Sequence, residues 1–320
     1  MSRLLLVSML IAVTTLLSAQ SSQSPDYTLR VQVELVQLPV SVIDEKGHPV
    51  RGLPQHYFKI YEDRVQQDIS FFKQEDVPVS IGLVIDASSS MFDKQDRTNA
   101  AALTFVRESN PEDETFVVSF GDQPHLEQDF TRSIRRLNRS LNRIAPRGNT
   151  ALFDAVQFAA RHLERGTHEK KVLVVVSDGE DNKSRLKLRD VLEEIRESKI
   201  ILYSVGLLSS EAALINNGPF KGKAKKALQD FSEVTGGRAF FPKSLNDVDE
   251  VCRTIAHDIR NQYAIGYRPS NDKMDGTWRT VNVQVQIPKG KPKVRVHTKK
   301  GYYSPNGARP ATELTPTAKK

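Results

Sequence analysis

The sequence predicts an α/β protein with a doubly wound, mostly parallel sheet in residues 77–262, flanked by segments that form a smaller β-sandwich-like module. Two nearly continuous apolar runs, residues 79–85 and 172–176, are typical of strands buried on both faces. Helical patterns alternate with these and other short apolar runs, which indicates βαβ crossovers. Before residue 77 and after residue 262, short strand patterns dominate instead.

Residues 1–19 have the pattern of a secretory signal peptide. Arg3 precedes an apolar run over residues 4–17, and the small residues Ser18 and Ala19 follow it. The run is shorter than the roughly 20 residues that a membrane-spanning helix needs. We therefore expect an exported protein, periplasmic or secreted, without a membrane span after cleavage. An uncleaved N-terminal anchor is the alternative.

The β flanks are expected at residues 27–75 and 263–304. In the first, strand patterns lie within residues 29–43, 57–61 and 69–72; in the second, within 263–267, 278–287 and 294–298. Either the two flanks pair into one module with the α/β domain inserted between them, or they form two separate flaps. The tail, residues 305–320, is rich in Pro, Thr, Ala and Lys, which predicts disorder.

The α/β domain is expected to alternate strands and helices along its length. Strands are predicted at residues 79–85, 115–120, 171–177, 200–205 and 238–241, and helices at 97–109, 132–144, 152–163, 188–198, 223–235 and 247–262. Gly236 and Gly237 end the fifth of these helices, because glycine readily adopts the left-handed conformation of a helix C-terminus.

The composition excludes several classes of protein. The 320 residues carry 46 Lys+Arg against 39 Asp+Glu and are 38% hydrophobic, as expected of folded domains. The single cysteine, Cys252, excludes a disulfide scaffold and a cysteine-based zinc site. The basic excess is small and contains no run of five Lys or Arg, so no nucleic-acid partner is expected.

Oxygen-bearing side chains follow the buried strands of the predicted sheet, where open α/β sheets bind ligands. Three short segments contribute: the loop after residues 79–85, the turn before the helix at 152–163, and the loop after residues 172–176. Carboxylates and hydroxyls without Cys or His suit a hard divalent cation, Mg²⁺ first and Mn²⁺ or Ca²⁺ next. The candidate ligands are Asp86, Ser88, Ser90, Thr150 and Asp178.

Other interpretations of these residues stay open. Asp86 and Asp178 could serve only as turn or cap residues, which Asp favours. Glu180 and Asp181 either raise cation affinity or are solvated loop acids. Ser88 as a nucleophile would need a nearby base, and the seven histidines show no triad or ligand spacing and are expected at the surface. We therefore expect no catalytic residues.

A basic stretch and two single residues carry weaker expectations. The arginines between residues 132 and 147 either form a solvated helix face or meet phosphates or an acidic partner. Ile134, Leu137, Leu141 and Ile144 are expected to pack on the sheet. Trp278 and Cys252 are expected in the core.

The order of these motifs resembles the von Willebrand factor type A (VWA) domain. D-x-S-x-S at residues 86–90, G-x-T-A-L at 148–152 and S-D-G at 177–179 match its metal-ion-dependent adhesion site (MIDAS). The resemblance covers about residues 77–262 and includes the segment Thr235-Gly236-Gly237-Arg238. One departure is Ser89, a spacer position at which such proteins usually carry Gly.

The resemblance implies a division of roles among the five residues. Ser88 and Ser90 would bind the metal directly, Thr150 directly or through water, and Asp86 and Asp178 mainly through water. With few direct anionic ligands the cation stays electrophilic, and an open coordination position accepts an Asp or Glu carboxylate from a partner protein. A shift of the last helix, residues 247–262, would accompany switching of the site.

The flanks resemble secreted bacterial VWA-related proteins of a family first described from acidobacteria. Residues 42–53 with Tyr61-Glu62-Asp63 are similar to its N-terminal β-module, and residues 262–267 with Gly301-Tyr302-Tyr303 to its C-terminal part. The whole sequence thus predicts an exported adhesion or protein-binding module. The alternative is a structural or assembly subunit of an envelope complex in which the metal only stabilises the fold.

Overall fold

The computed structural model describes residues 35–74, 76–207, 219–288 and 293–306, with the side chains of residues 219–221 left aside. The predicted signal peptide (1–19) and nearly all of the predicted tail (305–320) lie outside the described residues. Within those residues, no helix has the length and apolar character required to cross a bilayer.

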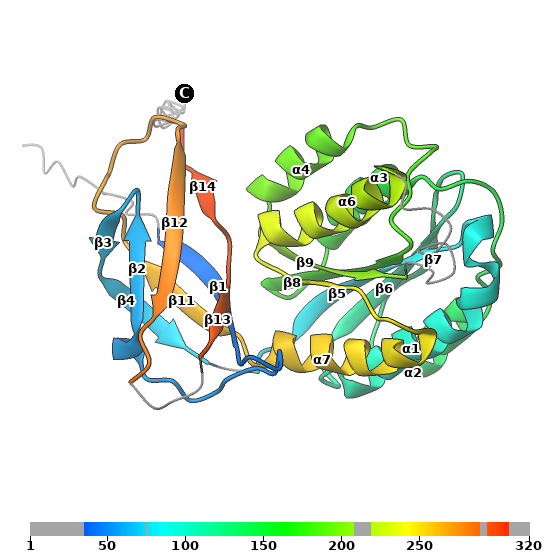
Figure 1. Cartoon of the computed structure of the whole chain (residues 1–320), viewed down its shortest axis with the longest axis horizontal. Helices are drawn as coiled ribbons and strands as arrows, with labels where there is room; N and C mark the ends of the chain where they lie inside the picture. The colour runs from blue at the N-terminus through cyan, green and yellow to red at the C-terminus, as the bar shows by residue number, and fades with distance from the viewer. Residues whose placement is uncertain (1–34, 75, 208–218, 289–292, 307–320) are drawn as a thin grey trace, which may run out of the picture. The chain divides into compact units, whose positions relative to one another are not determined.

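The α/β domain is built on a six-stranded sheet with the order β10-β9-β8-β5-β6-β7 (Figure 1). All neighbours pair in parallel except β7, which runs antiparallel to β6 at the edge. The prediction of a doubly wound, mostly parallel sheet is therefore confirmed. The strands are β5 (Val79–Asp86), β6 (Glu114–Phe120), β7 (Pro124–Thr131), β8 (Lys170–Ser177), β9 (Ile200–Gly206) and β10 (Ala239–Phe240).

The edge strand β7 has no counterpart among the predicted elements. Its sequence, PHLEQDFT, is mostly polar and begins with proline, and none of its eight residues is buried. Hydrogen bonds to β6, with irregular register, hold it in place. The strand propensity of residues 124–131 therefore does not predict a strand, and β7 forms because it pairs with β6.

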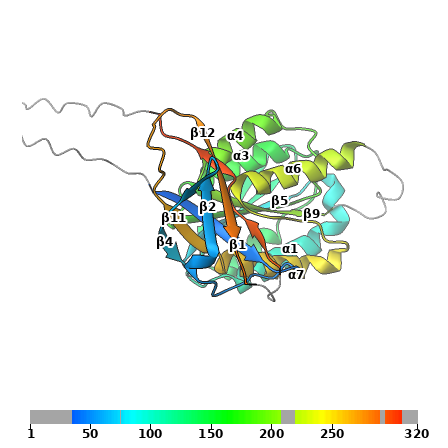
Figure 2. The ribbon, with the colours of Figure 1, turned by 60° about the vertical axis from the view of Figure 1, so that its left-hand side comes forward.

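Helices cover both faces of the sheet, as Figures 1 and 2 show. On one face lie α1 (Gln95–Glu108), α2 (Ile134–Leu141) and α7 (Val248–Arg260); on the other lie α3 (Leu152–Leu163), α4 (Leu188–Glu197) and α6 (Pro219–Thr235). Helix α2 is shorter at both ends than the predicted 132–144, and α7 follows a short 3-10 turn, η3 (Leu245–Asp247).

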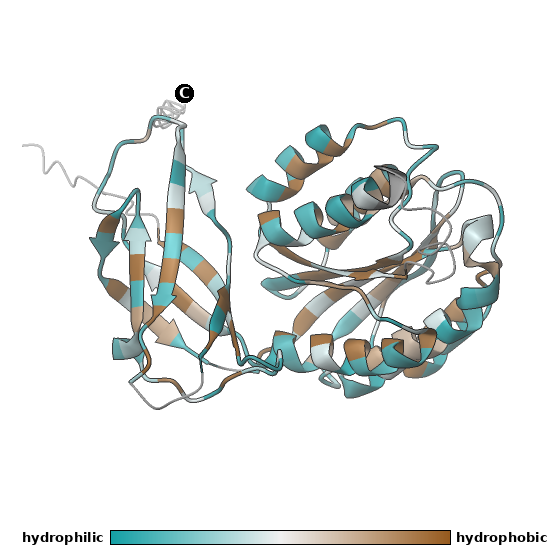
Figure 3. Ribbon diagram, in the orientation of Figure 1, coloured by the Kyte–Doolittle hydropathy of each residue, from teal (hydrophilic) through white to brown (hydrophobic). Residues whose placement is uncertain are grey.

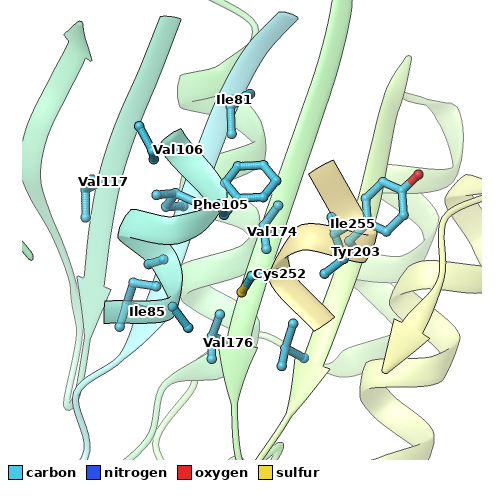
Figure 4. Packing of buried hydrophobic residues seen from close by; sticks show 14 of the residues in the cluster. Ile81, Ile85, Phe105, Val106, Val117, Val174, Val176, Tyr203, Cys252 and Ile255 are labelled. Carbon is cyan, nitrogen blue, oxygen red and sulfur yellow. The ribbon is translucent and has the colours of Figure 1, made fainter. Parts of the chain in front are cut away.

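Two hydrophobic clusters, one on each face, hold these layers together. All eight residues of β5 are buried, which explains its continuous apolar sequence. Figure 4 shows Ile81 and Ile85 of this strand packed near Phe105 of α1 and Cys252 of α7. In Figure 3 the same pattern appears as hydrophobic bands along the central strands. Cys252 is a core residue, as predicted, and burial raises the pKa of its thiol to about 12.

The β flanks form one module of two four-stranded sheets. The sheet orders are β13-β1-β11-β4 and β14-β12-β2-β3, so each sheet combines strands from both ends of the chain. A shared apolar cluster with Val40, Ile60, Tyr263 and Val281 joins the two sheets. The bounds are β1 (Val36–Ile43), η1 (Gln55–Tyr57), β2 (Phe58–Glu62), β3 (Val65–Gln67), β4 (Ile69–Lys73), β11 (Tyr263–Tyr267), β12 (Trp278–Val285), β13 (Arg295–His297) and β14 (Gly301–Tyr303).

A buried carboxylate links the two sheets of this module. Glu62 at the end of β2 accepts hydrogen bonds from the hydroxyl of Tyr267 on β11 (2.7 Å) and from that of Tyr302 on β14 (2.8 Å). The three residues come from three of the four flank motifs that carry the resemblance: residues 61–63, 262–267 and 301–303. Burial and the Glu62 carboxylate both raise the pKa of Tyr267, so the phenol keeps its proton in the folded protein.

This contact predicts a loss of stability in alkaline solution. An unfolded tyrosine ionises near 10.0, whereas the folded Tyr267 stays protonated, so the free energy of unfolding should fall as the pH rises above that value. Tyr267→Phe should lower stability at pH 7 by about 2 kcal/mol and give a shallower decline above pH 10. Urea unfolding across that pH range measures both effects. Tyr303→Phe is the control, since Tyr303 follows Tyr302 on β14 and its side chain is 37% exposed. Equal slopes for all three proteins would contradict the prediction.

Candidate functional site

The predicted site lies at the carboxyl edge of the parallel sheet, where β5 and β8 end side by side. Ile85 pairs with Val176, so the next residues, Asp86 and Ser177, are neighbours. The Ser177 hydroxyl donates to Asp86 Oδ2 at 2.6 Å. The carboxylate of Asp86 is completely buried and held in one orientation.

The loop after β5 continues this network toward Asp178. The Ser88 backbone N–H donates to Asp86 Oδ1 (2.9 Å), and the hydroxyls of Ser88 and Ser90 share a hydrogen bond of 3.0 Å. The Ser90 hydroxyl also lies 2.6 Å from Asp178 Oδ2, to which it donates. Four of the five predicted site residues are thus joined by a continuous chain of hydrogen bonds.

Thr150, the fifth predicted residue, is brought to the site by its loop. Arg147 donates its backbone N–H to Ala87 O (2.7 Å), and Ser89 donates both its N–H (3.1 Å) and its hydroxyl (3.0 Å) to Gly148 O. Ser89, at the position where glycine is usual, therefore fastens the two loops together. The Thr150 side chain is buried, and within the described residues it forms no hydrogen bond to the other four.

Three further residues support the site and were not predicted from the sequence. Ser177 orients Asp86, and the Asn182 side chain accepts the Thr150 N–H at 2.9 Å. Lys94, at the end of the 3-10 turn η2 (Ser89–Lys94), places its ammonium 3.7 Å from Asp178 Oδ2. The position of Ser177 directly before Asp178 is a sequence signal that could have identified it as a site residue. Lys94 and Asn182 have no such signal, because only the folding of their loops brings them to the site.

The electrostatics of the site favour a cation. Burial, and then the nearby Asp178 carboxylate, raise the pKa of Asp86 to about 6, although the hydrogen bonds from Ser177 and Ser88 oppose the shift. The carboxylates of Asp86 and Asp178 therefore lie close together in a largely buried site, with the ammonium of Lys94 beside Asp178. A divalent cation between them would relieve this repulsion.

The donor set fits a hard divalent ion that relies on hydroxyl as well as carboxylate oxygen. No group of three or more His, Cys, Asp or Glu that could hold a metal occurs among the residues that the structure describes. The two carboxylates and the hydroxyls of Ser88, Ser90 and Thr150 are all oxygen donors, the type that Mg²⁺, Mn²⁺ and Ca²⁺ prefer.

Glu180 and Asp181, the two acidic residues that follow Asp178, differ in their surroundings. Asp181 and Ser184 cap helix α3: Asp181 Oδ2 and Ser184 Oγ each accept the Phe153 N–H at 3.0 Å. The Asp181 carboxylate is therefore held by hydrogen bonds at the start of α3 and is not a freely solvated acid. Glu180 is exposed.

Several other residues differ from expectation. His162 is buried rather than at the surface, with its Nε2 2.8 Å from Asp129 Oδ1, because it occupies the inward face of α3. Ile134 is 43% exposed, since α2 begins there, and Trp278 is only partly buried against Tyr303 and Arg196. The arginines of the basic stretch are exposed, as a solvated helix face requires: Arg132, Arg135, Arg136, Arg139, Arg143 and Arg147.

Fold and site together define an open-sheet α/β domain with a carboxylate and hydroxyl cluster at its strand ends. Residues 81–180 match the family model described as the von Willebrand factor type A domain. The chain therefore contains a VWA domain, as its motifs predicted. The likeness of its flanks to the acidobacterial family stays a prediction.

Several solved structures are similar to this chain. The conserved hypothetical protein BatB from Bacteroides thetaiotaomicron is 14% identical, with a TM-score of 0.46 over 57% of this chain and 100% of its own. The vWF domain of the type V pili tip protein Mfa5 from Porphyromonas gingivalis is 15% identical, with 0.45 over 57% and 97%. A von Willebrand factor type A protein from Catenulispora acidiphila is 10% identical, with 0.48 over 84% and 75%. Among curated proteins, none matches the sequence.

Proposed function

We propose that this protein is an exported protein-binding module that captures an Asp or Glu carboxylate of a partner protein through a divalent cation, Mg²⁺ in the first place. The observation that carries the proposal is the hydrogen-bonded chain Asp86–Ser88–Ser90–Asp178 at the carboxyl edge of the sheet. The VWA domain supports a role in protein interaction, and the signal-like N-terminus supports export to the periplasm or the exterior.

Each residue has a part in holding the ion. Asp86, fixed by Ser177 and by the Ser88 N–H, supplies buried negative charge beneath the loop. Ser88 and Ser90 offer neutral oxygens, Asp178 a second carboxylate, and Thr150 a hydroxyl from the neighbouring loop. When bound, the cation supplies an electrophilic position that accepts an external carboxylate. Neutral ligands keep most of its charge available for that contact.

The same contacts argue for binding without catalysis. A nucleophilic serine needs a base within hydrogen-bond reach. In the described part of the chain, the hydroxyl of Ser88 shares a hydrogen bond with that of Ser90 and forms none with a histidine or lysine. We therefore propose that the protein is not an enzyme.

Capture of a partner from a native envelope extract tests the function. The purified protein should retain a partner in Mg²⁺ and lose it in EDTA, and Thr150→Ala should lose it in both. Thr104→Ala is the matched control, because the Thr104 hydroxyl bonds only to Ala100 O within helix α1. Calorimetry that finds neither Mg²⁺ nor Mn²⁺ binding to the native protein would contradict the metal site.

The second candidate is a structural subunit whose β module docks onto an envelope complex, with the metal only stabilising the fold. The observation that favours it is the two-sheet module, which joins both flanks into one body. Capture that survives EDTA and Thr150→Ala would support this role over adhesion.

Lys94 gives a further prediction at the site. Its ammonium lies 3.7 Å from Asp178 Oδ2 and competes with a cation for that carboxylate. Lys94→Met should therefore tighten Mg²⁺ binding by roughly threefold to tenfold, as expected for removal of a partly buried charge of the same sign. Calorimetry measures the change, and Lys187→Met, an exposed lysine before α4, is the control. Unchanged or weaker binding in Lys94→Met would refute the competition.

A further inference from the structure

A basic groove runs along the outer side of helix α3, beside the turn between β6 and β7. Its volume is about 580 Å³, a size typical of ligand sites. Its walls come from the β6–β7 turn, α3 and the loop before α4. The residues that matter for its chemistry are Asp122, Phe158, Arg161, Arg165, Lys183 and Arg185.

The carboxylates that line the groove are already engaged by the chain. Asp122 accepts hydrogen bonds from the backbone (3.1 Å) and side chain (2.7 Å) of Asn149, which lower the pKa of its carboxyl group. Asp154 accepts the backbone N–H groups of Arg185 (3.1 Å) and Leu186 (3.0 Å). Within the described residues neither carboxylate forms an ion pair with a basic side chain of the groove, although the charge of Lys183 also lowers the pKa of Asp122.

Most of the basic side chains, in contrast, remain available. Arg161 is held by Glu194 at 2.7 Å. Arg165, Lys183 and Arg185 are exposed, and within the described ranges none of them forms an ion pair. The groove thus presents three exposed basic side chains to a ligand, although Lys183 also interacts electrostatically with Asp122, and Arg165 with Asp129. Phe158, 37% exposed, adds an aromatic surface.

Hydrogen bonds connect residues of the groove to the loop of the proposed metal site. The Lys183 N–H donates to Thr150 O at 3.1 Å, and Asp122 binds Asn149, the residue before Thr150. Two residues that line the groove, Asp122 and Lys183, are therefore hydrogen-bonded to the loop that presents the Thr150 hydroxyl. A chain whose carboxylate reaches the cation would extend from there into the groove.

We propose that this groove binds an acidic segment of the partner protein. One Asp or Glu occupies the cation, further acidic side chains contact Arg165, Lys183 and Arg185, and an apolar side chain packs on Phe158. The proposal rests on the proposed function, because the cation selects a carboxylate. A nucleic acid fits less well: Phe158 is the only phenylalanine, tyrosine or tryptophan in the groove lining, whereas single-strand binding uses successive aromatic platforms.

Fluorescence anisotropy with a labelled synthetic peptide tests the proposal. The probe is an Asp- and Glu-rich peptide of about ten residues with one leucine, measured in Mg²⁺ at low salt, where charge contacts are least screened. The groove variant combines Arg165→Gln, Lys183→Gln and Arg185→Gln. The control combines Arg135→Gln, Arg136→Gln and Arg139→Gln, which removes the same charge from exposed positions on α2, on the opposite face of the sheet.

We expect the groove variant to bind the peptide at least tenfold more weakly, the control to change less than twofold, and both to bind Mg²⁺ like the native protein. Equal peptide affinity of the native protein and the groove variant would overturn the proposal. So would equal losses in both variants, no peptide binding by the native protein, or tighter binding of a single-stranded oligonucleotide of the same charge. Failure of the proposed function is distinguishable, since it appears as absence of Mg²⁺ binding by calorimetry.

Discussion

Replacing Gly237 with alanine is expected to destabilise the protein by about 3 kcal/mol or more. The chain leaves α6 through Gly236, whose φ is +79°, and Gly237 then crosses the backbone of β9. A Cβ atom at Gly237 would lie 2.0 Å from Leu202 O, a backbone atom that cannot move without disturbing the sheet. Urea unfolding of the purified variant measures the loss.

Gly222→Ala provides the matched control for this prediction. Gly222 lies in α6 as well, is exposed, and has nothing within 4 Å of the position of a Cβ atom. Alanine in an open helical position should leave stability unchanged or raise it by up to about 1 kcal/mol. Similar changes in both variants would show that close packing on β9 is not the cause.

Asp178→Asn is expected to separate metal binding from folding. Asp178 is one of only two carboxylates among the proposed ligands, so Mg²⁺ affinity should fall about 100-fold or more. Without metal the variant should be at least as stable as the native protein, because Asp86 loses the carboxylate that helps raise its pKa. Thermal unfolding in Mg²⁺ and in EDTA tests both parts: Mg²⁺ should raise the native Tm but leave that of the variant unchanged.

The neighbouring acid Asp181 supplies the control for Asp178. Its carboxylate accepts the Phe153 N–H at the start of α3 and the Ser184 hydroxyl, at 3.0 and 2.6 Å. Asp181→Asn should therefore lower stability by about 1 kcal/mol, as for the loss of a helix cap, while Mg²⁺ still raises its Tm. An Asp181→Asn variant that no longer responds to Mg²⁺ would place the ion elsewhere in the loop.

Much of the α/β domain could be predicted from local sequence. Strands buried on both faces, such as β5, are continuous apolar runs, and the helices that cover them repeat apolar residues with a helical period. The candidate site could be predicted for a related reason: parallel strands end at one edge, so Asp86 and Asp178 were expected at the same edge of the sheet. The pairing of β5 with β8 then makes them neighbours. Whether the five residues bind a metal stays a prediction.

Features that depend on distant segments could not be predicted in this way. Strand β7 is polar and is defined by its pairing with β6, and His162 is buried because of the face of α3 on which it lies. Sequence reasoning left open whether the flanks form one module. In the structure they form one module, because each of its two sheets combines strands from both flanks. Hydrogen bonds from Tyr267 and Tyr302 to Glu62 also connect the flanks.

Short segments of the sequence are enough to predict the class of fold and the chemical type of the site, since burial patterns and side-chain oxygens are local properties. Which groups come together depends on the tertiary structure: Ser177 with Asp86, Lys94 with Asp178, and the basic groove beside α3 with the loop of Thr150. These contacts depend on strand register and on the packing of loops that lie far apart in the sequence, so a local sequence pattern cannot predict them.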